Sequence, residues 1–389
     1  METQMAPSRS HRSLLCFSHL RWDFVYQRPQ HLMSRAAQSF RVYYFEEPVL
    51  REGAEPHLDF KTDSSGVVVV TPVVPEWGGQ TRLVQQFIAE NAPDRRTLWY
   101  YTPIARAWTS HLDADLIVYD CMDELSAFHA APPEMKLREA ELLRSADVVF
   151  TGGQSLYEAK RYAHPNVHAF PSSVDAAHFG QSRAPGVHDF RDQAHLPHPR
   201  LGFFGVIDER LDIQLLSQMA ELRPDWSFVM VGPVVKIDPA TLPRRPNIHW
   251  LGGRKYQELP SYLAHWDVGI MPFALNEATR YISPTKTPEF LAAGLPVVSS
   301  AITDVIRPYG ESGLVEIGRD AADFVGRAEK VLARPRVGWL REVDALLAGM
   351  SWDRTWGAML ARMQQADRAA PSSRRRSRGL AAEASHAGV

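Results

Sequence analysis

The sequence predicts an α/β protein built from two doubly wound domains, each with a parallel sheet between helices. Short apolar runs of strand length alternate with amphipathic stretches of helix length, and this alternation indicates parallel βαβ units. It stops between residues 180 and 199 and then starts again. The length of 389 residues also exceeds what one hydrophobic core usually fills.

The first half of the chain supplies one set of elements. Its expected strands are apolar runs at residues 13–18, 41–45, 66–74, 97–102, 116–120, 147–151 and 167–171. Its expected helices are amphipathic stretches at residues 28–38, 82–91, 133–145 and 154–162. Pro29 falls in the first turn of the first helix, where the missing N–H is no loss. Gly152-Gly153 closes the strand before the last of these helices.

The second half repeats the pattern after a break. Residues 180–199 carry three prolines and little apolar periodicity, so we expect an interdomain connection there. The strands expected after it cover residues 200–205, 226–232, 247–252, 268–272, 296–300 and 314–317. The helices expected after it cover residues 212–221, 259–264, 321–333 and 352–365.

These elements divide the chain into six parts. We expect a disordered N-terminus (1–12), an N-terminal domain (13–179), a linker (180–199), a C-terminal domain (200–350), a closing helix (351–366) and a basic tail (367–389). The tail is rich in Ala, Ser and Gly and holds five arginines against two acids, so disorder is expected. A solvated tail is the simpler interpretation, and weak electrostatic contact with anionic lipid is the alternative.

Composition and charge exclude several classes of protein. A net charge of −2 gives no overall attraction to nucleic acid or to anionic membranes. Two cysteines do not make a disulfide framework and fit a reducing compartment. No apolar run approaches the roughly 18 residues of a spanning helix, and the first residues lack the apolar core of a signal peptide. The sequence predicts a cytoplasmic protein, with peripheral contact at the inner face of the membrane as an option.

One segment indicates a ligand site. A loop, a short helix, a glycine stop and a buried strand follow one another from Ser283 onward. The loop of Ser283, Pro284 and Thr285 leaves free N–H groups at the positive end of the helix dipole, which is a place to hold a phosphate. Lys286 adds a charge, and Glu289 follows one turn later on the same face. A carboxylate there can pair with the hydroxyls of a ribose, so the segment predicts a clamp for a nucleoside diphosphate.

Three segments carry a resemblance to a known family. They are residues 22–32, 202–212 and 283–298, and a weaker similarity lies at residues 172–175. On these motifs the chain resembles the GT-B glycosyltransferases, and more narrowly the family 4-like enzymes of bacterial surface polysaccharides, particularly the teichuronic-acid type. The resemblance covers residues 13–365. It implies two Rossmann-like domains that face each other across a cleft.

The family pattern assigns roles to the C-terminal half. It implies a nucleoside-diphosphate sugar bound by the C-terminal domain, with the diphosphate at Lys286 and at the loop before it and the ribose at Glu289. Gly205 would let the backbone approach the ligand, and Arg210 would neutralise the leaving diphosphate. No metal is needed for that, and no cofactor is expected. The pattern Asp113-Ala114-Asp115 is better explained as a surface turn than as a metal site.

Two features depart from the family pattern. Retaining relatives commonly carry two glutamates eight positions apart, but Tyr281 stands eight positions before Glu289, and the nearest acid is Glu277. Relatives also carry a glycine-rich first loop, which residues 18–23 replace here. The stereochemical outcome therefore stays open.

The first domain offers candidates for the acceptor side. Asp120 and Asp123 come at the carboxyl end of a strand, where ligands lie in open parallel sheets, and a carboxylate there can deprotonate an acceptor hydroxyl. For Asp123 the alternative is a helix cap. Trp22, Asp23 and Arg28 follow the first strand. Arg28 can bind a phosphate or carboxylate or form a surface salt bridge, and Trp22 can stack on a sugar, although core packing is commoner.

The sequence therefore predicts a metal-independent glycosyltransferase of the hexosyltransferase type. It would move a sugar from a nucleoside-diphosphate sugar to a hydroxyl of a glycan or lipid-linked acceptor in bacterial surface polysaccharide synthesis. One alternative is a nucleotide-sugar 2-epimerase of the same fold, and another is a non-catalytic nucleotide-sugar-binding protein. A dehydrogenase is not indicated, because no G-x-G-x-x-G follows a first strand.

Overall fold

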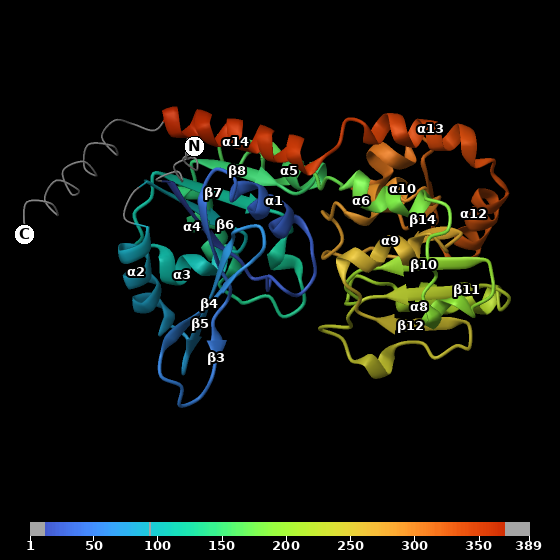
Figure 1. The fold of residues 1–389 in the computed structure, drawn as a ribbon, viewed down its shortest axis with the longest axis horizontal. Coiled ribbons are helices and arrows are strands. Elements are labelled where there is room, and N and C mark those ends of the chain that lie inside the picture. Colours follow the sequence, from blue (N-terminus) through green and yellow to red (C-terminus); the bar gives the residue numbers. More distant parts are fainter. Residues whose placement is uncertain (1–11, 93–94, 370–389) are drawn as a thin grey trace, which may run out of the picture.

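The computed structural model describes residues 12–92 and 95–369. It shows two α/β domains side by side, and the C-terminal helix returns from the second domain to the first (Figure 1). Arg12, which we expected in a disordered terminus, is the first residue of a strand, and residues 367–369 belong to the last helix. The rest of the predicted N-terminus and basic tail lies outside the described residues.

The N-terminal domain is built on one sheet with the strand order β3-β5-β2-β1-β6-β7-β8-β9. All pairs in this order are parallel, and β4 adds to β5 in the antiparallel direction. The strands are β1 (Arg12–Phe17), β2 (Arg41–Phe45), β3 (Val49–Leu50), β4 (His57–Thr62), β5 (Val68–Val74), β6 (Arg95–Tyr100), β7 (Leu116–Cys121), β8 (Val148–Thr151) and β9 (Val167–Ala169). The sequence did not predict β4, because its side chains are largely exposed and form no apolar run.

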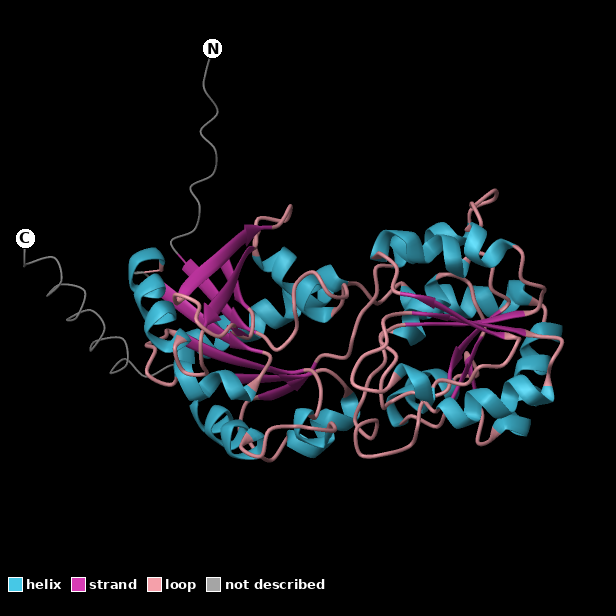
Figure 2. Cartoon of the chain, turned by 90° about the horizontal axis from the view of Figure 1, so that it is seen from below, coloured by secondary structure: helices cyan, strands magenta, loops and turns pink. Residues whose placement is uncertain are grey.

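Helices cover both faces of this sheet (Figure 2). They are α1 (Arg28–Ala36), α2 (Gln80–Asn91), α3 (Arg106–Thr109), α4 (Met135–Ser145) and α5 (Gln154–Lys160). Alternate residues of β1 belong to two different hydrophobic clusters, Leu14 and Cys16 to one and Leu15 and Phe17 to the other. Because neighbouring side chains of a strand point to opposite faces, both faces of the sheet are buried, as expected for a doubly wound domain.

The C-terminal domain has a fully parallel sheet with the order β12-β11-β10-β13-β14-β15. The strands are β10 (Arg200–Phe204), β11 (Ser227–Val231), β12 (Ile248–Gly252), β13 (Val268–Met271), β14 (Val297–Ser299) and β15 (Val315–Ile317). The helices are α8 (Ile213–Leu222), α9 (Leu259–Leu263), α10 (Lys286–Ala292), α11 (Thr303–Val305), α12 (Ala321–Ala333) and α13 (Arg336–Leu347). The strand order reverses between β10 and β13, and ligands bind at the carboxyl ends of strands beside such a point.

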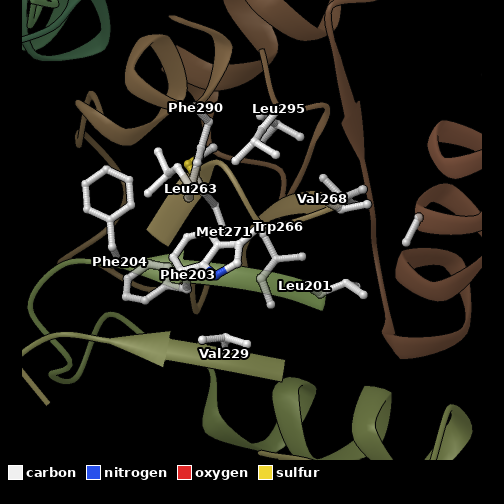
Figure 3. Packing of buried hydrophobic residues seen from close by; sticks show 14 of the residues in the cluster. Leu201, Phe203, Phe204, Val229, Leu263, Trp266, Val268, Met271, Phe290 and Leu295 are labelled. Atoms are coloured by element: carbon white, nitrogen blue, oxygen red, sulfur yellow. The ribbon is translucent and has the colours of Figure 1, made fainter. Parts of the chain in front are cut away.

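Two glycines let large rings pack closely against this sheet. Figure 3 shows the rings of Trp266 and Phe290 among the buried side chains. A Cβ atom at Gly202 of β10 would lie 2.0 Å from the ring of Trp266, and one at Gly269 of β13 would lie 2.8 Å from the ring of Phe290. Phe290 belongs to α10 and is fully buried. The missing side chain at Gly269 therefore sets how closely α10 approaches the sheet.

Residues 180–199, which we expected to be a linker, pack against the C-terminal domain. They follow α6 (Ala176–Gly180) and contain α7 (Arg191–Ala194). Phe179 and Leu196 belong to the core of the C-terminal domain, and Phe190 stacks on Tyr262 with 4.7 Å between ring centroids. Apolar side chains spaced along this stretch thus reach the core of the C-terminal domain, although the sequence shows little apolar periodicity there.

The last helix, α14 (Trp352–Ala369), completes the N-terminal domain. It contacts α1, β7 and β8, and Trp352, Trp356, Met359 and Met363 share a hydrophobic cluster with Leu14 of β1.

Within residues 12–92 and 95–369, no helix has both the length and the apolar composition needed to cross a membrane.

Candidate functional site

A cleft with a volume of about 1240 Å³ lies between the two domains. It is bordered by the segments that follow β1 and β7 in one domain and β10, β11, β12 and β13 in the other. The predicted site residues that line it are Trp22, Asp23, Arg28, Asp123, Gly205, Arg210, Ser283, Pro284, Thr285, Lys286 and Glu289. The structure thus brings together candidates from both halves of the chain. Asp120 does not line the cleft.

Gly205 makes room for Lys286 at the end of β10. Its φ is +138°, and a Cβ atom there would lie 2.6 Å from Cε of Lys286. The space that we expected a ligand to use is therefore crossed by the lysine side chain. Gly232, at the end of β11, is a related position that the sequence analysis missed, since a Cβ atom there would lie 1.7 Å from the carbonyl oxygen of Gly205. Only glycine fits at either position without a shift of the backbone.

Lys286 and Glu289 present opposite charges at the first turn of α10. Glu289 is buried, with 7% of its surface exposed, and Lys286 is half-buried. Burial lowers the pKa of the Lys286 ammonium group, and the Glu289 carboxylate opposes this effect. Burial raises the pKa of Glu289 to about 7, against the opposing effect of Lys286. No described residue forms a salt bridge with either group, and a hydrogen bond with the Thr285 side chain acts to lower the pKa of Glu289.

Arg210 is held in place by Asp208. Its Nε and Nη2 atoms donate to the Asp208 carboxylate at 3.0 and 2.7 Å. Asp208 is itself buried, with 4% of its surface exposed. The guanidinium also lies 5.4 Å from the ring centroid of Phe128 in the N-terminal domain. This fixed cation lines the same cleft as Lys286.

Asp120 and Arg28 form a buried ion pair with each other. The Arg28 Nε and Nη2 atoms donate to the Asp120 carboxylate at distances from 2.8 to 3.2 Å, and Nη1 donates to the carbonyl oxygen of Phe170 at 2.8 Å. Asp120 is 0% exposed and Arg28 is 1% exposed. The expectation that Asp120 contacts an acceptor fails on this geometry, because β7 continues to Cys121 and its carboxylate points inward. Arg28 forms a buried pair rather than the surface salt bridge that we considered.

Asp123 is the carboxylate that faces the cleft after β7. It is partly buried, and none of the described residues donates a hydrogen bond to its carboxylate. Burial raises the pKa of Asp123, while the positive charges of Arg210 and Lys286 in the other domain lower it. Asp123 lines the cleft from one domain, and Arg210 and Lys286 line it from the other. A carboxylate with a raised pKa is suited to accept a proton from a hydroxyl group.

The loop after β1 in the N-terminal domain is held in place by hydrogen bonds to Glu46. Glu46 accepts hydrogen bonds from Arg21 Nη1, Trp22 N and Thr71 Oγ1 at 2.8 to 2.9 Å. Trp22 is 6% exposed and packs edge-on against Tyr44 with 4.9 Å between ring centroids, so core packing accounts for most of its surface. Asp23 is exposed and pairs with Lys61 at 2.5 Å.

Neither Glu277 nor Tyr281, the two positions considered for the second glutamate of the family pattern, lines the cleft. Glu277 is exposed, pairs with Arg280 at 3.6 Å and does not line the cleft. Tyr281, which occupies the expected position in the sequence, packs against the core of the N-terminal domain. Within the part of the chain that the structure describes, no three His, Cys, Asp or Glu side chains are grouped as a metal site.

Comparison with known proteins links part of the chain to a named family. Residues 198–334 match the family described as "Glycosyl transferases group 1". The chain is also 29% identical over 261 residues to the Bacillus subtilis (strain 168) protein "Putative teichuronic acid biosynthesis glycosyltransferase TuaH". This match covers 62% of the chain and 64% of the relative.

Solved structures show the same fold over nearly the whole chain. Sucrose-phosphate synthase from Thermosynechococcus elongatus has a TM-score of 0.64 at 15% identity and covers 91% of this chain and 98% of its own. The E. coli trehalose-6-phosphate structure bound with UDP-2-fluoro glucose has a TM-score of 0.65 at 11% identity, with 91% and 99% covered. WaaG, a glycosyltransferase involved in lipopolysaccharide biosynthesis, has a TM-score of 0.62 at 13% identity, with 90% and 99% covered. These findings confirm the GT-B fold and the resemblance to GT-B glycosyltransferases.

The raised pKa of Glu289 predicts a pH-dependent stability. With a folded pKa of about 7 against an ordinary value of 4.5, the folded state binds the extra proton between these values, so the free energy of unfolding falls as pH rises through this range. Glu289→Gln should remove this dependence and be more stable than wild type at pH 8 by on the order of 2–3 kcal/mol, with little difference at pH 5. Urea unfolding of the ligand-free protein at both pH values measures this, with Glu277→Gln as the exposed control. If the free energy of unfolding of Glu289→Gln differed from that of wild type by the same amount at both pH values, the prediction would be wrong.

Proposed function

We propose that the protein transfers a sugar from a nucleoside-diphosphate sugar to a hydroxyl group of a glycan or lipid-linked acceptor. The observation that carries this proposal is the placement of charged side chains on the two sides of the cleft. Lys286, Glu289 and Arg210 line it from the C-terminal domain, and Asp123 lines it from the N-terminal domain. A site with fixed cations on one side and an available carboxylate on the other suits the departure of an anionic group and the arrival of a hydroxyl.

The C-terminal side fits the donor. Lys286 and the N–H groups of the loop at residues 283–285 would bind the diphosphate, and Arg210 would add a second cation. Glu289 would accept hydrogen bonds from the ribose hydroxyls. The neighbour with UDP-2-fluoro glucose supports this placement at the level of the fold.

The N-terminal side fits the acceptor. In the proposed reaction an acceptor oxygen forms a bond to the anomeric carbon of the sugar, and the bond from that carbon to the diphosphate breaks. Asp123 takes the proton of the acceptor hydroxyl. The negative charge that develops on the diphosphate is stabilised by Lys286 and Arg210.

We further propose that this chemistry needs no metal, because the two cations supply the charge that a metal would otherwise provide. The expected outcome is that transfer activity is unchanged after dialysis against EDTA. Loss of activity that Mg²⁺ or Mn²⁺ restores would reject the proposal.

We propose an acceptor and a cellular setting that agree with the named relatives. The similarity to a teichuronic acid glycosyltransferase and to a lipopolysaccharide glycosyltransferase supports a role in bacterial surface polysaccharide synthesis. We propose that the protein acts in the cytoplasm, with peripheral contact at the inner face of the membrane. Flotation of the full chain with vesicles of neutral or anionic lipid tests this contact. Equal recovery of the protein with and without anionic vesicles would reject it.

Loss of the Glu289 carboxylate should weaken donor binding. Glu289→Ala removes the acceptor for the ribose hydroxyls, so we expect the Kd for the donor to rise about tenfold to a hundredfold. Calorimetric titration with common nucleoside-diphosphate sugars measures this, and Glu277→Ala is the matched exposed control. A donor affinity equal to that of wild type would remove Glu289 from the donor site.

Loss of the Asp123 carboxylate should block transfer but not donor binding. Asp123→Asn keeps the shape of the side chain and removes its basicity, so we expect kcat to fall by about 10² to 10⁴ with the donor Kd nearly unchanged. Asp59→Asn on the exposed strand β4 is the control. Full activity in Asp123→Asn would exclude it as the base, and epimerised free sugar in the absence of acceptor would favour the epimerase alternative.

A further inference from the structure

Tyr256 lines the cleft from the C-terminal domain and packs among other aromatic rings. It follows β12 in the C-terminal domain. One ring face stacks on His178 of α6 at 4.1 Å between centroids with an angle of 10°. Tyr26 of the N-terminal domain lies 4.7 Å from the same ring, and Phe179 meets its edge at 5.6 Å. These contacts fix the direction of the Tyr256 hydroxyl group.

The hydroxyl group of Tyr256 is buried without a hydrogen-bond partner among the described residues. Native proteins rarely leave a buried polar group unpaired, and an exception calls for an explanation. The carboxylate of Glu289 is close enough that, after burial itself, its charge is the largest cause of a raised pKa at Tyr256. Tyr256 and Glu289 also line the same cleft from the C-terminal domain.

We propose that the Tyr256 hydroxyl group is a second binding group for the donor ribose, beside Glu289. This inference rests on the proposed function, in which Glu289 accepts hydrogen bonds from the ribose hydroxyls. An ionised carboxylate can only accept, whereas a tyrosine O–H can donate. A pair of ribose hydroxyls offers both donors and acceptor oxygens, so Tyr256 and Glu289 together complement it.

The stacked ring makes this contact specific. His178 and Tyr26 hold the Tyr256 ring before a ligand arrives, so little conformational freedom is lost when its hydroxyl binds. The contact also explains why a hydroxyl is present at a position where phenylalanine would pack equally well. A ligand that lacks the matching ribose hydroxyl would leave the Tyr256 hydroxyl unpaired and bind less well.

Tyr256→Phe tests the inference because it keeps the stacked ring and removes only the hydroxyl. We expect the Kd for the ribonucleoside diphosphate that binds wild type, chosen from UDP, ADP and GDP by calorimetry, to rise about threefold to tenfold. The melting temperature without ligand should not fall, since no intramolecular hydrogen bond is lost. Tyr101→Phe is the matched control, because its hydroxyl is also buried without a described partner but lies outside the cleft.

Deoxynucleotides separate this contact from a general loss of binding. Wild type should bind the 2′-deoxy or the 3′-deoxy form of the same nucleotide more weakly than the ribo form, and Tyr256→Phe should show a smaller difference. Unchanged affinity in Tyr256→Phe, together with weaker binding in Glu289→Ala, would overturn this inference and leave the proposed function standing. A wild-type protein that binds no nucleoside diphosphate would overturn both.

Discussion

The close packing of Phe290 on Gly269 determines where the functional groups of the C-terminal domain lie. The ring leaves no room for a Cβ atom at Gly269, and Phe204 and Trp266 surround the same ring at 5.1 and 6.3 Å. This contact seats α10 on β13, beside the point where the strand order reverses. Lys286 and Glu289 occupy the first turn of that helix, so a hydrophobic contact on the buried face fixes the charges on the face toward the cleft.

The site is defined by the contrast between charges that are paired and charges that are not. Arg28 and Asp120 satisfy each other in the interior and join α1 to the ends of β7 and β9. A buried ion pair of this kind gains little net stability, but loss of one partner is costly. Asp123, Lys286 and Glu289 have no such partners among the described residues, although burial shifts the pKa of each. Ionisable groups whose pKa is shifted by burial cluster at ligand-binding and catalytic sites.

The sequence predicted the elements that bury a periodic apolar face and missed those that do not. The buried strands and the main helices have patterns that a single chain reveals, whereas β4 is exposed and residues 180–199 reach their core through scattered side chains. Asp120 and Asp123 looked equivalent, because only the end of β7 separates an inward carboxylate from one that faces the cleft. The sequence did not identify Tyr256 as a site residue, since its partners Tyr26 and His178 are distant in the sequence.

The two halves of the proposed chemistry lie on different domains, so their geometry depends on the contacts that join the domains. Ser155 N donates to Asp304 Oδ1 at 2.9 Å and His129 N donates to Glu209 Oε1 at 3.1 Å, and each bond crosses between the domains. Aromatic contacts join the domains as well, since the ring centroids of Tyr26 and Tyr256 lie 4.7 Å apart and Tyr281 packs against the core of the N-terminal domain. The distance from Asp123 to Lys286 and Arg210 therefore depends on these interdomain contacts rather than on either sheet alone. A base on one domain and a diphosphate site on the other act together only while these contacts hold.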